Sequence, residues 1–218
     1  MGSIIAICSW KGGVGKSTAT TTLAVNLAAQ GYAVAVIDCD PNQAFAVWHK
    51  TAEAPPLTVT SCIDHNEIVA HAMTQGDEHD VTLLDTAGFA NQTAVFGMGT
   101  ADLVLIPCMP DRNSVLEARK TAKQVESISR IARRTIPHRL LLTRWTPKGL
   151  AEKATLEDIE EAGLIPLSQH LSDLVAFQKA TFSGVMPRTG LIGHQTDRVI
   201  EALRGLEAIP AKPVRKKT

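Results

Sequence analysis

The sequence predicts an α/β fold in which a doubly wound, mainly parallel sheet carries helices on both faces. Two observations lead to this prediction. Short and nearly continuous apolar runs alternate with segments of helical periodicity along most of the chain, and strands that are covered on both faces have this apolar character. A glycine-rich loop also lies between the first apolar run and the first helical segment, which is an arrangement typical of α/β sheets.

Five apolar runs are predicted to form the core strands, and a sixth run is a possible short edge strand. The core runs are residues 4–9, 33–38, 81–85, 103–107 and 139–143, and the edge run is residues 57–60. Helical patterns occur at residues 17–30, 67–73, 91–99, 114–132 and 196–208. Ligands of such sheets bind at the carboxyl ends of the strands, so we expect the functional residues there.

The most specific motif is the stretch 11–18, which reads Lys-Gly-Gly-Val-Gly-Lys-Ser-Thr. Glycines let the backbone turn tightly, so that several N–H groups point at one phosphate group, and the start of the helix adds partial positive charge. In such a loop Lys16 reaches the terminal phosphates and the Ser17 hydroxyl binds magnesium. A flexible turn beside a surface lysine would not account for the strand and helix on either side.

Two aspartates, Asp38 and Asp40, follow the second predicted strand, and Pro41 then forces the chain to turn. Carboxylates at this spacing can point into one crevice, where one binds magnesium through water and the other orients an attacking water. The alternative is an Asp-Pro turn with a solvated acid. Because the pair follows the phosphate loop by one βα unit, the sequence favours the catalytic interpretation.

A third motif closes the predicted strand 81–85, where an apolar run ends on Asp85 and Gly88 follows. A carboxylate at the end of such a strand reaches magnesium indirectly in phosphate-loop proteins. Gly88 would let a backbone N–H approach the γ-phosphate. Alone, this motif is weak evidence for a magnesium site, but in combination with the loop at Lys16 it is strong evidence.

The loop departs from the usual phosphate-loop template, because Trp10 stands where a glycine is expected and Lys11 follows it. This form resembles the deviant Walker A loop of the ParA/MinD family of P-loop ATPases. The resemblance implies ATP and Mg²⁺ as cofactors and an ATP-bound homodimer in which Lys11 contacts the nucleotide of the other subunit. It also implies that Asp40 assists hydrolysis.

The resemblance carries a set of expected site residues. The catalytic residues are Lys11, Lys16 and Asp40, and the metal residues are Ser17, Asp38 and Asp85. The nucleotide-binding residues are Lys11, Gly12, Gly13, Val14, Gly15, Lys16, Ser17 and Thr18, with Arg144 and Pro187 near the base. Two positions differ from the family pattern, since Ser114 stands where many members have aspartate and Leu174 where some partition ATPases have arginine.

The short chain and Trp48 resemble the small plasmid-type ParA proteins, which partition DNA. For these the resemblance implies ATP-dependent, nonspecific DNA binding and a centromere-binding or adaptor protein that stimulates slow hydrolysis. A positioning ATPase for conjugation machinery or another cargo is the main alternative. A MinD-like membrane switch is disfavoured, because prolines interrupt the C-terminal region. The early Lys11 argues against a biosynthetic ligase, and no membrane partner is expected.

The chain has 218 residues, with 22 Lys plus Arg against 22 Asp plus Glu, so DNA binding would need a local basic patch. One candidate patch is Arg130, Arg133, Arg134 and Arg139, and the other is Lys212, Arg215, Lys216 and Lys217. We expect a single ATPase domain over residues 1–210 and a flexible basic tail over residues 211–218.

The cysteines and histidines suggest no metal site or disulfide framework. The four cysteines lie far apart and form no Cys-x-x-Cys pair, which together with the absence of an evident signal peptide predicts a cytoplasmic protein. His65, His71 and His79 lie near acidic residues, but their spacing matches no metal-ligand template. We therefore expect these histidines of the segment 51–80 to lie on a solvated helix and loop.

Overall fold

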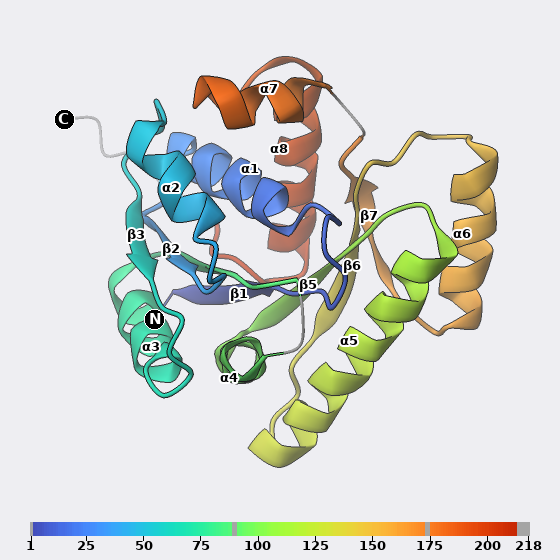
Figure 1. Cartoon of the computed structure of the whole chain (residues 1–218), viewed down its shortest axis with the longest axis horizontal. Coiled ribbons are helices and arrows are strands. Elements are labelled where there is room, and N and C mark those ends of the chain that lie inside the picture. The colour runs from blue at the N-terminus through green and yellow to red at the C-terminus, as the bar shows by residue number, and fades with distance from the viewer. Residues whose placement is uncertain (1, 89–90, 173–174, 213–218) are drawn as a thin grey trace.

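The computed structural model describes residues 2–88, 91–172 and 175–212. Within these residues the centre is a seven-stranded parallel sheet with the order β3-β2-β4-β1-β5-β6-β7 (Figure 1). The strands are β1 Ser3–Ile7, β2 Val34–Asp38, β3 Thr58–Ser61, β4 Val81–Asp85, β5 Leu103–Cys108, β6 His138–Leu142 and β7 Pro166–His170. The helices are α1 Lys16–Ala29, α2 Ala44–Thr51, α3 Ile68–Glu78, α4 Gln92–Thr100, α5 Arg112–Ala132, α6 Leu150–Glu161, α7 Val175–Ser183 and α8 Gly190–Gly205.

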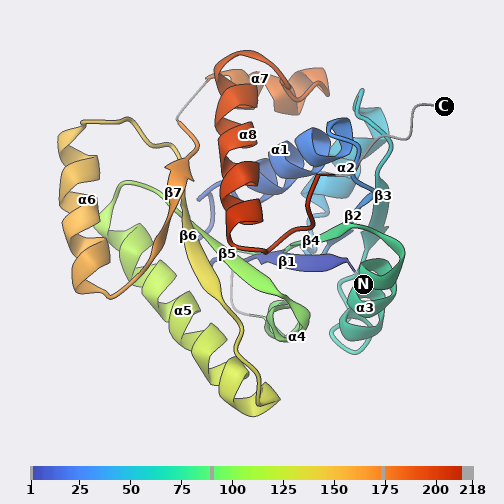
Figure 2. The same cartoon turned by 180° about the vertical axis from the view of Figure 1, so that it is seen from behind.

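Helices cover both faces of this sheet. Helices α1, α2, α7 and α8 lie on one face and α3 to α6 on the other, as the two opposite views show (Figures 1 and 2). Ile5 and Ile7 of β1 pack in the core cluster that includes α1 and α8, whereas Ile4 and Ala6 pack in the cluster that includes α3 and α5. Successive side chains of a strand point to opposite faces, so both faces need apolar residues. The predicted doubly wound fold is confirmed.

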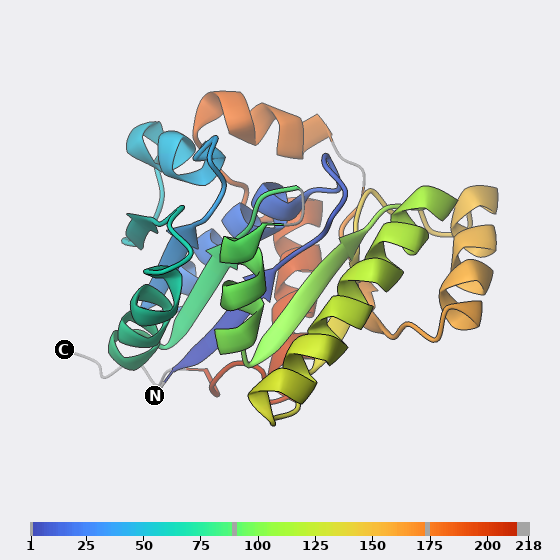
Figure 3. The same ribbon diagram turned by 60° about the horizontal axis from the view of Figure 1, so that its bottom comes forward.

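The four helices of the second face lie side by side in chain order, with α4 between α3 and α5 and α6 beyond α5 (Figure 3). On the first face α1 packs against the sheet and against α8. Residues 19–27 of α1 are buried as a result. This burial fixes the N-terminus of α1, and with it the glycine-rich loop, at the carboxyl edge of the sheet.

The predicted strands agree with the structure to within two residues at each end, and β4 has the predicted bounds. Strand β7 and helices α2, α6 and α7 were not predicted from the sequence. β7 is one of the two edge strands of the sheet, and only Leu167 in it is buried, so it lacks the apolar run of an inner strand. Helix α8 begins at Gly190, six residues before the predicted start of that helix.

Candidate functional site

The predicted phosphate loop lies at the carboxyl edge of the sheet, between β1 and α1. Asp85, the last residue of β4, is paired with Ile7 of β1 on one side and with Asp38, the last residue of β2, on the other. The parallel register therefore brings the ends of three strands together. They border a cavity of about 520 Å³ whose lining residues are Gly12, Gly13, Gly15, Lys16, Ser17, Thr18, Asp40, Asn42, Gly88 and Arg144.

The backbone of the loop has a shape that requires glycine. Gly15 precedes α1 with φ of +91° and Gly13 has φ of +73°, which side-chain-bearing residues rarely adopt. The Gly15 carbonyl accepts the N–H of Ala19 at 2.8 Å, so the helix begins directly after the turn. Thr143 Oγ1 of the segment after β6 donates to the Val14 carbonyl at 2.8 Å and pins the loop. The start of α1 thus faces the cavity, as in anion sites at helix N-termini.

Lys16 supplies a buried positive charge to the cavity. Its side chain is buried (7% exposed), and Nζ donates to the Lys11 carbonyl at 3.3 Å. Burial lowers the pKa of Lys16, while the nearby carboxylates of Asp85 and Asp40 raise it. A buried ammonium is costly without an anionic partner, so this lysine is well placed to bind phosphate.

Asp85 is a buried carboxyl group with one unsatisfied oxygen. Its Oδ1 accepts a hydrogen bond from Thr20 Oγ1 at 3.1 Å, whereas among the described residues Oδ2 has no partner. Burial raises the pKa of Asp85 to about 7, hydrogen bonds with Ser17 and Thr20 and the charge of Lys16 oppose this rise, and the charge of Asp38 adds to it. A buried carboxylate oxygen beside the Ser17 hydroxyl matches the oxygen ligands that Mg²⁺ prefers.

Asp38 and Asp40 have different environments although they are two residues apart. Asp38 is fully buried, and its two oxygens accept the backbone N–H groups of Asp40 at 3.1 Å and Ala46 at 2.9 Å. Asp40 lines the cavity, and its Oδ1 accepts from the backbone and side chain of Asn42. Asp38 thus shapes the turn between β2 and α2, while Asp40 faces the cavity.

Gly88 approaches the phosphate loop too closely for any side chain. A Cβ atom at this position would lie 3.0 Å from Gly12 Cα and 3.1 Å from Lys16 Nζ. Real Cβ atoms rarely come this near to backbone, so the loop would have to move. The absence of a side chain keeps the end of the β4 segment in contact with the loop that would hold the phosphates.

Lys11 has a position unlike that of Lys16. Its Nζ donates to both oxygens of Asp111 at 2.9 Å and to Ser114 Oγ at 2.9 Å, and it does not line the cavity. Burial alone would raise the pKa of Asp111, but hydrogen bonds from Lys11 and Ser114 lower it. The side chains of Lys11 and Asp111 are 22% and 37% exposed. The ammonium group is therefore held at the surface beside the start of α5.

The structure brings most of the expected residues together but not all of them. Five of the expected residues do not line the cavity: Lys11, Val14, Asp38, Asp85 and Pro187. Met186, next to Pro187, packs in the core cluster that includes α1. Sequence reasoning missed Thr20, Thr143 and Asp111. The spacing of hydroxyl residues in α1 could have indicated Thr20, but the other two lie more than 90 residues from their partners.

Comparison with known proteins supports this arrangement. Residues 5–187 match the family described as "CobQ/CobB/MinD/ParA nucleotide binding domain". Protein ParA of Rhizobium radiobacter is 29% identical over 145 residues, which span 66% of this chain and 65% of that protein. Protein virC1 of the same organism is 28% identical over 91% of this chain and 89% of its own length.

A carboxysome distribution protein and two solved structures extend the likeness. The maintenance of carboxysome distribution protein A of Halothiobacillus neapolitanus is 26% identical over 83% of this chain and 84% of its own. A variant of Cyanothece McdA bound to ATP has a TM-score of 0.80 at 14% identity, over 98% and 99% of the two chains. MinD of Pyrococcus horikoshii with Mg-ADP has a TM-score of 0.79 at 15% identity, over 98% and 100%. The chain therefore belongs to the CobQ/CobB/MinD/ParA family of nucleotide-binding domains, with ParA and MinD proteins among its relatives.

Proposed function

We propose that this protein is an ATPase that binds Mg-ATP, dimerises in the ATP-bound state and hydrolyses the nucleotide slowly. The cycle would partition or position a cargo, and DNA is the first candidate for that cargo. One observation carries the proposal: two lysines of one loop have opposite placements, with Lys16 in the cavity and Lys11 outside it. The likeness to ParA, McdA and MinD proteins supports this choice of chemistry.

Nucleotide binding follows from the charge and shape of the cavity. The N–H groups of the glycine loop and Lys16 would hold the phosphates, and Ser17 and Asp85 would hold the metal. Magnesium, when bound, neutralises charge on the β- and γ-phosphates. Asp38, whose oxygens are occupied by backbone N–H groups, would position the Asp40 turn and lie outside the direct shell of the ion. Arg144 would lie on the base side and Pro187 further away.

Hydrolysis needs a group that orients water, and Asp40 is the carboxylate that lines the cavity. We expect Asp40→Ala to bind Mg-ATP but to lower turnover by about 10²–10⁴-fold, the usual range for a lost acid–base group. Phosphate release in single-turnover assays would measure this. Asn42→Ala is the matched control, since it keeps the Asp40 carboxylate and removes only one of the two Asn42 groups that donate to it, so its loss of turnover should be smaller. Normal turnover by Asp40→Ala would refute the assigned role.

Dimerisation is assigned to Lys11. In the single chain its ammonium pairs with Asp111 and Ser114, and in the dimer it would turn to the phosphates of the other subunit. A partly exposed ion pair is worth about 0.2–1 kcal/mol, so a phosphate chain can displace it. Before dimerisation, the ion pair with Asp111 would hold Lys11 in place, and the phosphates of an ATP-bound partner subunit would displace it.

We expect Lys11→Ala to keep its ATP affinity and to lose ATP-dependent dimerisation. Asp111→Asn should tighten dimerisation by up to about fivefold, because it weakens the competing pair. Light scattering with titrated protein would measure both variants. If Lys11→Ala dimerised like the wild type with ATP, the lysine would have no role at the interface.

A DNA-binding surface is supported by the basic patch at the C-terminal end of α5. Arg130, Arg133, Arg134 and Arg139 line one hollow of about 750 Å³, at the end of the sheet opposite the phosphate cavity. The Arg134 guanidinium donates to the Gly99 and Ala101 carbonyls, so it caps the C-terminal end of α4. Arg130, Arg133 and Arg134 are exposed, and Arg130 and Arg133 are the two whose guanidinium groups do not bond these carbonyls. Residues 213–218 of the basic tail, and Leu174, lie outside the described residues.

With Mg-ATP, we expect salt-sensitive binding to duplex DNA of any sequence, since phosphate contacts release counterions. Arg130→Ala with Arg133→Ala should weaken it and lower the salt slope by about two for each chain, and removal of residues 212–218 should weaken it separately. Lys153→Ala on α6 is the control. Mobility-shift titrations at several salt concentrations would test this.

A positioning role for another cargo is the second candidate, favoured by the likeness to a carboxysome distribution protein. It would share the nucleotide chemistry and replace DNA by another surface. Absence of DNA binding at low salt with ATP would select this candidate. A hydrolysis-stimulating centromere-binding or adaptor protein is proposed in either case. No helix among the described residues is both long and apolar enough to cross a membrane.

A further inference from the structure

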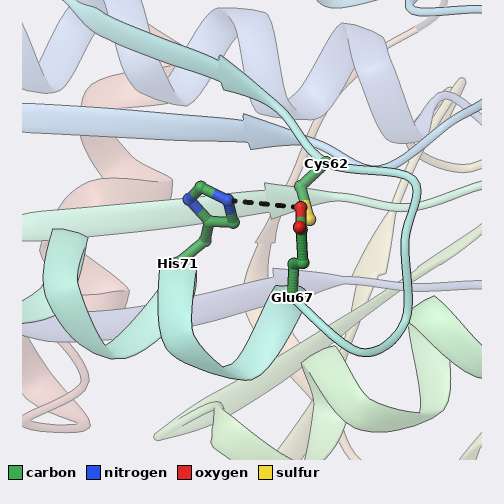
Figure 4. Close-up of side chains that lie close together, drawn as sticks. All are labelled: Cys62, Glu67 and His71. Carbon is green, nitrogen blue, oxygen red and sulfur yellow. Dashed lines mark ion pairs between the residues drawn. The ribbon is translucent and has the colours of Figure 1, made fainter.

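A group of three metal-ligand side chains lies away from the phosphate cavity, at the carboxyl end of the edge strand β3. Cys62, Glu67 and His71 each offer one donor atom, and the three donor atoms lie within 4.8 Å of one another (Figure 4). We propose that Cys62, Glu67 and His71 form a binding site for a divalent transition-metal ion, with Zn²⁺ as the best match. The proposal is independent of the ATPase cycle.

The three residues come from two elements that a short turn brings together. Cys62 directly follows β3, and its N–H donates to the Asp38 carbonyl at 3.0 Å. Asp64 builds the turn, since its Oδ1 accepts from the backbone and side chain of Asn66. Glu67 then stands at the start of α3, and the His71 N–H donates to the Glu67 carbonyl at 3.0 Å. Residues four apart share one helix face, and here this face meets the cysteine.

The donor set selects the ion. Thiolate sulfur, imidazole nitrogen and carboxylate oxygen together are typical of Zn²⁺, whereas Mg²⁺ and Ca²⁺ prefer oxygen alone. Donor atoms roughly 2.0–2.3 Å from a tetrahedral ion lie roughly 3.3–3.7 Å from one another. His71 Nε2 is already 3.9 Å from Glu67 Oε2. The donor atoms therefore need to approach one another by only a short distance. The Glu67 and His71 side chains are 65% and 40% exposed, so they can rotate to do so.

Three protein ligands leave a fourth position for water or an incoming ligand. Binding would replace the proton of the Cys62 thiol by the metal ion, and that proton would pass to solvent. The neighbouring histidines have other contacts. His79 contacts Thr58 and the Gln75 carbonyl, and His65 stacks on Phe96. Sequence reasoning missed the site because it weighed the histidines with nearby acidic residues and did not combine them with Cys62.

The test uses the reduced, full-length protein with excess Mg-ADP, so that the phosphate cavity is not available to the probe. Titration with Co²⁺ should give a thiolate-to-metal charge-transfer absorption that saturates at one ion per chain, and Zn²⁺ should abolish it by competition. Cys62→Ser should remove the absorption. His71→Ala, an exposed change that leaves the core intact, should weaken Co²⁺ binding by at least about tenfold.

His79→Ala is the matched control, because it removes a histidine of the same helix region that lies outside the group. It should bind Co²⁺ as the wild type does. Charge-transfer absorption that persists in Cys62→Ser would show that another cysteine binds the ion and would overturn the proposal. The same holds if the wild type binds no Co²⁺, or if His71→Ala binds it normally. A cation in the phosphate cavity cannot imitate the result, because none of the lining residues there is a cysteine.

Discussion

Replacing Lys16 with alanine is expected to reduce ATP turnover by about 10²–10³-fold, the loss seen when one preorganised charge or donor is removed from a transition-state site. Lys16 is the buried cation of the cavity, and burial already lowers its pKa. Burial disfavours the charged ammonium, so an anionic phosphate beside it would offset this desolvation cost. Without Lys16, the Asp85 and Asp40 carboxylates would repel the nucleotide, so affinity for Mg-ATP should fall as well.

Calorimetric titration with Mg-ATP and steady-state phosphate release would measure these effects. Lys153→Ala on the exposed face of α6 removes the same charge far from the cavity and should behave as the wild type does. Unchanged Mg-ATP affinity in Lys16→Ala would contradict the assignment of the glycine loop to the nucleotide site.

Asp85→Asn is expected to stabilise the nucleotide-free protein at neutral pH and to abolish its magnesium-dependent activity. Burial raises the pKa of Asp85 to about 7, whereas an unfolded aspartate has a pKa of about 3.9. The protonated carboxyl therefore favours the folded state. Its contribution is complete below about pH 3.9 and is lost as the pH rises to about 7. Above that pH the folded protein carries a buried carboxylate with one unpaired oxygen.

The asparagine variant has no such titration, so the difference in free energy of unfolding isolates Asp85. The free energy of unfolding of the variant minus that of the wild type should rise by about 1.4 kcal/mol per pH unit from pH 5 to about pH 7 and then level off. Urea unfolding at several pH values would measure it. Mg-ATP should stabilise the wild type and not the variant. A difference that does not depend on pH would show that Asp85 does not titrate in this range.

Much of the fold could be predicted from the sequence because its inner strands are covered on both faces. Strand β4 consists of buried residues throughout, so its apolar run marked it at the correct bounds. The phosphate loop could be predicted because its glycines, its lysine and the following helix are adjacent in sequence. The edge strand β7 and helix α6 could not, since few of their side chains are buried and their apolar periodicity is weak.

The site contained contacts that no local pattern reveals. Lys11 and Asp111 are 100 residues apart, and they meet because β1 and β5 are neighbours in the sheet. The two aspartates of the 38–42 segment share one motif, yet the structure separates them into a buried group and a cavity group. Such distinctions depend on the packing of distant segments, so sequence alone leaves them open.

The most direct test of the central claim is the mass of the Asp40→Ala variant in solution with Mg-ATP and with Mg-ADP. This variant should retain ATP without consuming it, so the ATP-bound state persists during size-exclusion chromatography with light scattering. We predict twice the 23.4 kDa of one chain with Mg-ATP, and one chain with Mg-ADP or when Lys11→Ala is added to the variant. A mass of one chain at saturating Mg-ATP, with binding verified by calorimetry, would contradict the ATP-dependent dimer and the role of Lys11.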